Sequence, residues 1–424
     1  MIRILKEAET NRGEIFARED PVDSVEEPVR AILAQVKARG DEALKEYTKA
    51  FDGVELTSLE VGPGAVDEGF RSADPLLVEI LYRAAERIAA FHQHQVRNSF
   101  LVNEEDGILM GQKVLPLARV GLYVPGGTAA YPSSVLMNCI PAKLAGVKEI
   151  CMVTPPGKNG KIPPNILAAA RICGVDRVFR VGGAQAVAAL AYGTESIPKV
   201  DKIVGPGNQF VAEAKKQVFG QVGIDMVAGP SEVLVVADSS ARPHWLAADM
   251  LSQAEHDMLA SAILLTDDIT LAEQVQQELE KQCSQLPKAQ IAGKSLMDWG
   301  AIVVVPNIMT AVAIANRVAP EHLELCVRDP WALLPHIRHA GAIFMGQHSP
   351  EPVGDYFAGP NHVLPTLRTA RFSSALSVQN FCKKTSIVAT SPAFLLENAP
   401  AIASLARLEG LEAHARSVEI RSKR

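Results

Sequence analysis

The sequence contains no run of about 18 uninterrupted apolar residues, the length that a membrane-spanning helix requires. Its N-terminus, residues 1–8, has no apolar core and carries acidic residues early, unlike a secretion signal. Basic residues are also in deficit, because 42 Lys and Arg stand against 48 Asp and Glu. The net charge of −6 argues against a nucleic-acid-binding protein, whose binding face is normally basic. We therefore expect no contact with membranes or nucleic acid.

Cysteine is sparse, and none of the six cysteines forms a C-x-x-C pair. Most of them lie in apolar stretches, which predicts reduced, buried thiols of a cytoplasmic protein rather than a disulfide framework or a thiolate zinc site. A nucleophilic role for Cys139 or Cys382 is the weaker alternative, because a buried free cysteine usually acts as a small hydrophobic residue. The short basic run at residues 421–424 is interpreted as a solvated tail.

The rest of the composition is that of a folded protein. The chain has 424 residues, of which 48% are hydrophobic and 21% charged, so about two to four domains are expected. Its first hundred residues have helical periodicity. One predicted helix follows Asp23-Ser24 and has Val29, Leu33 and Val36 on its apolar face, and another runs from about Asp74 to Phe91.

From residue 119 onward, predicted strands and helices alternate. Four strands are expected at 119–124, 149–154, 177–181 and 202–204, with helices at 133–145, 165–173, 184–191 and 208–219. A second series has strands at 233–237, 262–266, 301–305, 323–327 and 342–345, with helices at 243–256, 271–282 and 310–318. This alternation predicts an α/β fold with two Rossmann-like parallel-sheet units. We expect the early helices to complete the second unit, and a helical segment from residue 377 to the end.

Three glycine turns follow strands of the first unit: Pro125-Gly126-Gly127, Gly182-Gly183 and Gly205-Pro206-Gly207. Ligands bind at the carboxyl ends of strands in open α/β sheets, and glycine lets backbone N–H groups approach a phosphate. No G-x-G-x-x-G fingerprint is present. A nucleotide site and a purely structural role of these turns are therefore equally supported.

Four shorter patterns carry candidate chemistry. Gln253 and His256 are three residues apart at the end of a predicted helix, where both could bind one divalent cation, although such a pair alone is more often ordinary surface. Glu321 and His322 place a carboxylate beside an imidazole, with a helix cap as the alternative. On an extended segment these two side chains would point in opposite directions unless a turn brought them together. The loop 351–362, which is rich in Pro and Gly, contains Asp355, and a polar helix near the C-terminus carries residues 409–414.

Together and in this order, these stretches resemble the histidinol dehydrogenase family over nearly the whole chain. The blocks that carry the resemblance are VGLYVPGG at 120–127, VGGAQA at 181–186, VGPGN at 204–208, AGPSE at 228–232, QAEHD at 253–257, APEHL at 319–323 and PVGDY at 352–356. Several independent blocks in one order are far more specific than any single motif. The absence of the G-x-G-x-x-G fingerprint is consistent with this resemblance, since this family binds NAD without it.

The resemblance implies a zinc- and NAD-dependent, four-electron oxidation of L-histidinol to L-histidine through histidinal, the last stage of histidine biosynthesis. It implies the acid/base pair Glu321 and His322. The implied zinc ligands, for one Zn²⁺ per subunit, are Gln253, His256, Asp355 and His414. The implied substrate contacts are Ser231, Gln253, His256, His322, Asp355, Glu409 and His414, and the implied NAD contacts are Tyr123, Gln185 and Asn208.

By the same resemblance, His322 would take the substrate's hydroxyl proton and Glu321 would activate water for the second oxidation, while zinc orients the substrate. A homodimer is implied, in which Glu409 and His414 serve the other subunit. The implied division is a small segment at 1–19, a discontinuous α/β domain at 20–122 plus 235–376, a second α/β domain on the NAD side at 123–234, and a C-terminal helical segment at 377–424.

Three other functions remain as alternatives. A related dehydrogenase could oxidise a small hydroxylated sulfonate or a polyol, in which case a sulfonate would need a pocket rich in Arg or Lys. A zinc hydrolase could use Glu321 to activate water without any nicotinamide. A non-catalytic metal-binding protein is the third alternative, but it would have no need of glycine turns at strand ends.

Overall fold

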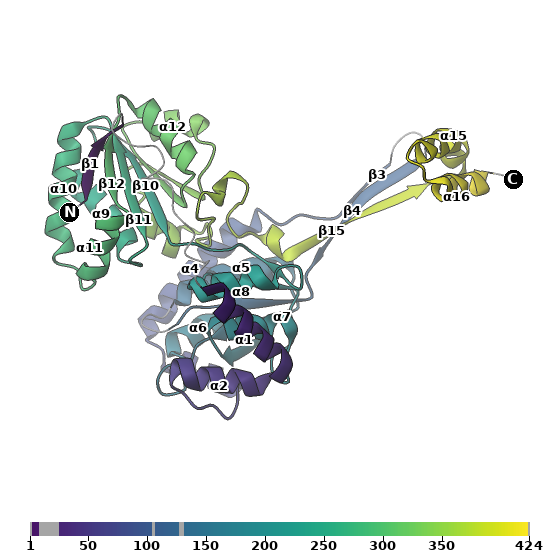
Figure 1. The fold of residues 1–424 in the computed structure, drawn as a ribbon, viewed down its shortest axis with the longest axis horizontal. Coiled ribbons are helices and arrows are strands. Elements are labelled where there is room, and N and C mark those ends of the chain that lie inside the picture. The colour runs from purple at the N-terminus through teal and green to yellow at the C-terminus, as the bar shows by residue number, and fades with distance from the viewer. Residues whose placement is uncertain (1, 8–24, 104–106, 127–130, 423–424) are drawn as a thin grey trace.

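The computed structural model describes residues 2–7, 25–103, 107–126 and 131–422. Figure 1 shows two α/β lobes and an arm that extends away from both of them. The first lobe comprises residues 25–98, 117–126 and 131–226, and the second lobe comprises residues 2–7 and 231–349. The arm is made by residues 99–103, 107–116 and 382–422. The segment 350–381 packs between the lobes, against a helix of each.

The first lobe is built on a six-stranded sheet in the order β2-β7-β6-β5-β8-β9. All neighbours are parallel except β2, which is antiparallel to β7. The strands are β2 Glu60–Val61, β5 Arg119–Tyr123, β6 Glu149–Thr154, β7 Arg177–Arg180, β8 Lys202–Val204 and β9 Gly223–Ile224. β6 is buried from its second residue onward, because helices cover both faces of the sheet.

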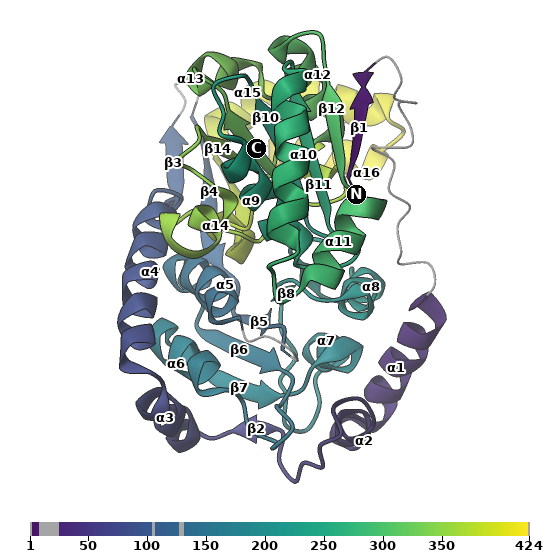
Figure 2. The same cartoon turned by 90° about the vertical axis from the view of Figure 1, so that its left-hand side faces the viewer.

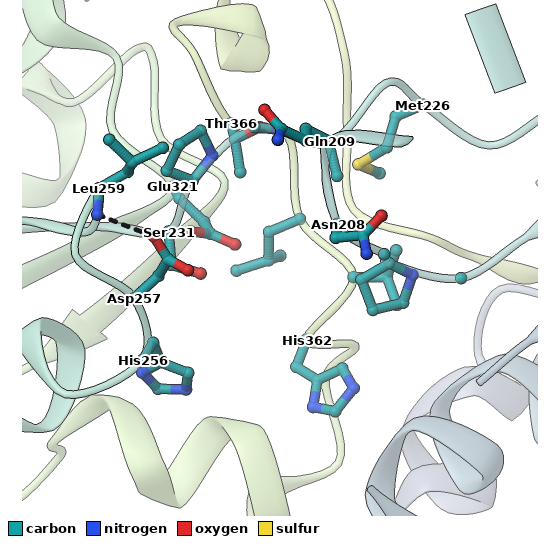
Figure 3. Close-up of a pocket in the computed structure, with 18 of the residues that line it drawn as sticks. Asn208, Gln209, Met226, Ser231, His256, Asp257, Leu259, Glu321, His362 and Thr366 are labelled. Carbon is teal, nitrogen blue, oxygen red and sulfur yellow. Dashed lines mark hydrogen bonds between the residues drawn. The ribbon is translucent and has the colours of Figure 1, made fainter. Parts of the chain in front are cut away.

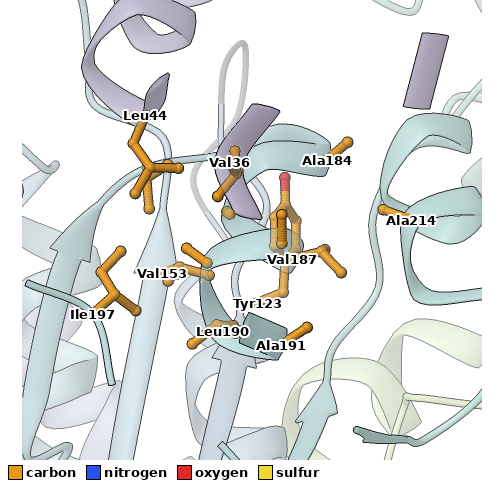
Figure 4. Packing of buried hydrophobic residues seen from close by; sticks show 14 of the residues in the cluster. Val36, Leu44, Tyr123, Val153, Ala184, Val187, Leu190, Ala191, Ile197 and Ala214 are labelled. Atoms are coloured by element: carbon orange, nitrogen blue, oxygen red, sulfur yellow. The ribbon is translucent and has the colours of Figure 1, made fainter. Parts of the chain in front are cut away.

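Two hydrophobic clusters attach helices to the faces of this sheet. One face packs against α1 Glu26–Arg39, α2 Asp41–Asp52, α7 Gly183–Tyr192 and α8 Gln209–Val218. Figure 4 shows this cluster, in which Val36 and Leu44 meet Val153 and Val187. The other face packs against α3 Pro63–Ser72, α4 Pro75–Gln93, α5 Pro132–Ala145 and α6 Pro164–Cys173.

The second lobe has a fully parallel sheet in the order β1-β12-β11-β10-β13-β14. Its strands are β1 Arg3–Lys6, β10 Glu232–Ala237, β11 Ser261–Thr266, β12 Ala301–Val304, β13 His322–Cys326 and β14 Ala342–Met345. Figure 2 shows the face covered by α9 Pro243–Ala254, α10 Ile269–Cys283 and α11 Ala289–Asp298. The opposite face packs against α12 Ile308–Val318, with the short α13 Pro330–Leu333 beyond it.

The arm is a three-stranded antiparallel sheet with two helices at its tip. β15 Cys382–Thr390 pairs with β4 Ile108–Pro116, and β4 pairs with β3 Phe100–Asn103. The chain continues into α15 Pro392–Leu408 and α16 Glu412–Ser422, which pack on each other at the far end of the arm (Figure 1). Large apolar side chains stay exposed there, including Leu405 at 65% and Leu408 at 84%.

Two sequence predictions about the fold are wrong. The early helices do not complete the second unit, because the apolar faces of α1 and α4 are buried against the first lobe. The second sheet gains β1 instead, a strand of only four residues. The chain from residue 377 is not helical throughout, because residues 382–390 form β15 and pair with β4 along their whole length.

The two parallel-sheet units are confirmed, and their predicted strands match the observed ones within one or two residues. The division into domains stays a prediction. Most of the proposed segment 1–19 lies outside the described residues, as do Gly127 and the last two residues of the basic tail. All six cysteines are free. Among the described helices, none is both long enough and apolar enough to span a bilayer.

Candidate active site

Residues from both lobes line one cavity of about 400 Å³. The first lobe contributes the turn at 205–209, and the second contributes Ser231, His256 and Glu321. Figure 3 shows labelled side chains of both groups around the same open space. The turn follows β8, whereas Ser231 and Glu321 precede β10 and β13. The carboxyl edge of the first sheet therefore faces the amino edge of the second.

Glu321 and His322 are brought together by the backbone of Glu232. The N–H of Glu232 donates to Glu321 Oε2 at 2.9 Å, and the carbonyl of Glu232 lies 3.0 Å from His322 Nδ1. Glu321 Oε2 is 3.7 Å from His322 Nδ1. The two neighbouring side chains therefore do not diverge as on a free extended segment, because the parallel neighbour β10 holds both.

The partner of Nδ1 fixes the tautomer of His322. A carbonyl oxygen can only accept, so Nδ1 carries the hydrogen and the lone pair is left on Nε2. His322 Nε2 is buried, has no hydrogen-bond partner among the described residues, and lies 3.8 Å from Asp355 Oδ1. A buried imidazole with a free lone pair is suited to accept a proton from a bound ligand.

Burial shifts the pKa values of Glu321, His322 and Asp355. Burial, with the neighbouring Glu232, Asp355 and Glu351, raises the pKa of Glu321 well above its usual range. Burial lowers the pKa of His322, so its imidazole is neutral at pH 7. Burial and the adjacent Glu351 raise the pKa of Asp355 to about 9. His322 is therefore ready to take a proton, whereas the carboxyl groups retain theirs until a cation or a higher pH removes them.

Two of the implied zinc ligands, Gln253 and His256, each have a donor atom that fits a divalent cation. Gln253 Oε1 is buried without a hydrogen-bond partner among the described residues, an expensive state unless it meets a cation or a donor. His256 Nδ1 lies 2.9 Å from the carbonyl of Ser252, so its Nε2 keeps a free lone pair, the usual arrangement of a metal-binding histidine.

The structure adds one carboxylate to this group that the sequence did not single out. Donor atoms of His322, Glu351 and Asp355 all lie within 4.8 Å of one another. Glu351 Oε2 also accepts from the hydroxyl of Ser252 at 3.1 Å. Its place four residues before Asp355, in the same loop, was the only signal in the sequence.

The three predicted NAD contacts do not occupy the same environment. Asn208 lines the cavity and caps α8, its Oδ1 accepting from the N–H of Phe210 at 3.1 Å. Tyr123 and Gln185 are buried, 4% and 2% exposed, and do not line the cavity. The Tyr123 hydroxyl accepts from the N–H of Gly183 at 3.1 Å, and burial raises the pKa of this phenol to about 12.

Two predicted substrate contacts lie elsewhere in the chain. Glu409 and His414 are exposed at the tip of the arm, where they line a separate hollow between α15 and α16. Figure 1 places this tip far from both lobes. Within one chain, neither residue reaches the cavity that contains Ser231 and His256.

His362 is a cavity residue that the sequence analysis did not select, although its loop was noted. Its Nδ1 lies 3.1 Å from the carbonyl of Asp355, which again leaves the lone pair on Nε2. Burial lowers its pKa to about 4. A histidine seven residues after a candidate metal ligand, in the same Pro/Gly-rich loop, was the available signal.

Comparison with known proteins gives one consistent family. Residues 17–422 match the family model described as histidinol dehydrogenase. The chain is 55% identical over 399 residues to a histidinol dehydrogenase of Halalkalibacterium halodurans, covering 94% of each chain, and 54% identical over 396 residues to that of Bacillus subtilis, covering 93% of each. A crystal structure of histidinol dehydrogenase from Elizabethkingia anophelis is similar with a TM-score of 0.94 and 37% identity, covering 99% of this chain and 97% of that one.

Proposed function

Because this chain belongs to the histidinol dehydrogenase family, whose oxidoreductase activity in histidine biosynthesis it shares, we propose how its residues carry out the reaction. The proposed conversion is L-histidinol to L-histidine through histidinal, with two NAD⁺ and one Zn²⁺ per subunit. The observation that supports this proposal is the unpartnered Nε2 of His322, which lies 3.8 Å from Asp355 Oδ1. The neighbouring residue Glu321 lines the cavity that also includes the turn at 205–209.

Gln253, His256 and Asp355 would hold the zinc ion, with His414 of a second copy as the remaining protein ligand. When bound, zinc orients the imidazole and amine of histidinol, and NAD⁺ accepts a hydride in each oxidation. The unpartnered Gln253 Oε1 and the lone pair on His256 Nε2 support this donor set.

The chain's own residues move the protons. His322 Nε2 takes the hydroxyl proton as hydride leaves the carbinol carbon, giving the aldehyde. Glu321 then takes a proton from water as the water oxygen bonds to the aldehyde carbon. The alkoxide that forms takes the proton that His322 gained in the first oxidation, which gives the hydrate and returns His322 to its neutral form. His322 accepts the hydrate's hydroxyl proton in the second oxidation, which yields the carboxylic acid. The sum is histidinol, water and two NAD⁺ converted to histidine and two NADH, with protons released to solvent.

We also propose that the active unit is a homodimer in which each arm completes the other subunit's site. The arm carries Glu409 and His414 away from its own cavity and exposes Leu396, Leu405 and Leu408. Apolar surface of this kind is normally covered by a protein partner. A second copy would bury these side chains and bring a carboxylate and an imidazole to the zinc end of the cavity.

The first test is stoichiometric. Zinc-loaded protein with limiting L-histidinol and excess NAD⁺ is expected to give two NADH per histidinol, and a chelator should abolish NADH formation. No NADH would overturn the proposal and redirect the search to other small alcohols and then to hydrolysis. One NADH would show that the first oxidation proceeds without the water-activating step.

The second test asks whether each active site is completed by residues of the other subunit or is made by one chain alone. H256A and H414A should each be inactive alone. Refolding them together as an equal mixture should restore about one quarter of wild-type activity, because half of the dimers are mixed and each has one intact site. Absence of recovery in dimers shown to be mixed would refute the shared site.

A further inference from the structure

A fully buried ion pair lies beneath the glycine turn of the cavity. Lys215 of α8 and Asp225, which follows β9, form this pair, with side chains only 2% and 0% exposed. Neither ammonium nor carboxylate is open to water. A buried ion pair is weak evidence of stabilisation, since an apolar pair of similar volume is often equally stable. Its presence here calls for a different explanation.

Both charged groups bind one residue, Gly205. Lys215 Nζ donates to the carbonyl of Gly205 at 3.0 Å, and the N–H of Gly205 donates to Asp225 Oδ2 at 2.8 Å. Asp225 Oδ1 also accepts from the N–H of Met226 at 2.7 Å, and Met226 lines the cavity. The pair therefore fixes the backbone of the turn at both polar groups of Gly205.

The opposite side of the turn is closed by β5. Gly205 has φ +115°, and a Cβ added to it would lie 2.1 Å from the carbonyl oxygen of Tyr123. The backbone of Gly205 therefore has no room to move toward β5, while Lys215 and Asp225 hold its N–H and carbonyl. Residues 205–208 are thus held in one shape where they face the cavity.

We propose that Lys215 and Asp225 are positioning residues for NAD⁺, because they hold both backbone groups of Gly205 and so fix the turn that carries Asn208. This inference rests on the proposed cofactor. Neither side chain is placed to contact the cofactor itself, since both are buried and their charges balance each other within the pair. Their loss should weaken NAD⁺ binding and leave histidinol and zinc binding unchanged.

The test compares two double variants by calorimetric titration with NAD⁺ and by steady-state kinetics. K215M/D225L removes the charges and both hydrogen bonds to Gly205. K215M/D225N removes the charges but retains an acceptor for the Gly205 N–H. We expect K215M/D225L to raise the Kd and KM for NAD⁺ at least about tenfold, with zinc content and the KM for histidinol unchanged. K215M/D225N should recover part of the affinity.

A matched control is the pair Lys143 and Asp176 in the same lobe. Their side chains are 3.0 Å apart, and Asp176 also accepts a backbone N–H, that of Ile150 at 2.8 Å, but neither residue lines the cavity. K143M/D176L should therefore leave NAD⁺ binding unchanged.

Equal NAD⁺ affinity in wild type and K215M/D225L would overturn this inference but leave the proposed cofactor standing. The same holds if K215M/D225L loses as much affinity for histidinol as for NAD⁺. A wild-type chain that binds no NAD⁺ would overturn the proposed cofactor and this inference with it. If K215M/D225L does not fold, wild type is compared with K215M/D225N, which should still bind NAD⁺ more weakly than wild type. Identical binding by these two would refute the positioning role.

Discussion

The substitution E321Q should separate the two oxidations. Glu321 is 6% exposed, and its Oε2 accepts the N–H of Glu232 at 2.9 Å. Glutamine has nearly the same volume and retains an acceptor for that N–H, so the fold and the position of His322 should persist. What it loses is a carboxylate that can take a proton from water. Removing a general base typically slows its step by about 10²–10⁴, or roughly 3–5 kcal/mol in activation free energy.

The assay is rapid mixing of limiting histidinol with zinc-loaded protein and excess NAD⁺, followed by NADH absorbance. Wild type should reach two NADH per histidinol. E321Q should form the first NADH within a few-fold of the wild-type rate and the second about 10²–10⁴ times more slowly. E321A is a poorer probe, because it would leave the buried N–H of Glu232 unpaired at a cost of about 1–3 kcal/mol.

The pH dependence of the second oxidation provides another test of this role of Glu321. Burial raises the pKa of Glu321, so its basic form becomes more populated as pH rises. The second wild-type phase should therefore accelerate with pH more steeply than the same phase in E321Q. Equal slowing of both oxidations by E321Q would refute the assignment of Glu321 to water activation alone, and so would two NADH formed at wild-type rates.

Two further changes test the site through stability. Burial lowers the pKa of His362 from 6.5 to about 4, so the folded state favours the neutral imidazole. The free energy of unfolding should therefore be fully retained above pH 6.5 and should fall as the pH drops toward 4. In urea titrations across this range, H362N should show a decrease that is smaller than that of wild type by about 3 kcal/mol. G205A should lower the free energy of unfolding by about 3 kcal/mol or more and abolish NAD⁺ binding, because its Cβ would lie 2.1 Å from the Tyr123 carbonyl oxygen. G64A in the first turn of α3, where an added Cβ would have nothing within 4 Å, is the control and should be neutral or slightly stabilising in urea titrations.

The two sheets could be predicted because their strands are buried on both faces. Such strands are continuous apolar runs in the sequence, and β6 was predicted with the observed bounds of 149–154. β15 has no fully buried residue, and most of its side chains are exposed, so neither a continuous nor an alternating apolar pattern marks it. β1 is only four residues long and depends on β12, almost 300 residues away, for its pairing. Contacts of this range leave no local signal.

The same limit applies to the site. Glu321 and His322 were found as neighbours, but their convergence depends on hydrogen bonds to Glu232, about 90 residues earlier in the chain. Glu351 was passed over because a carboxylate in a turn is common, and only folding brings it within 4.8 Å of His322 and Asp355. The positions of Glu409 and His414 gave no indication that an arm would carry them away from their own cavity.

The polarity of the cavity favours the proposed substrate, histidinol, over a sulfonate. His256 and His322 each direct Nδ1 at a backbone carbonyl, so each offers a lone pair on Nε2. His362 also directs Nδ1 at a carbonyl, but its Nε2 lies 3.5 Å from the hydroxyl oxygen of Ser134. None of the described residues that line the cavity is Lys or Arg, whereas Asp257 and Glu321 are among them. Asp225 also borders the cavity, but its buried carboxylate is paired with Lys215. A sulfonate would therefore meet hydrogen-bond acceptors and carboxyl groups, with no side-chain cation in the lining to balance its charge. Histidinol brings an ammonium, an imidazole and a hydroxyl, and the first and last are hydrogen-bond donors that such a cavity can accept. The arrangement therefore favours a cationic amino alcohol over an anionic alcohol, and a sulfonate analogue should compete with histidinol only weakly in the NADH assay.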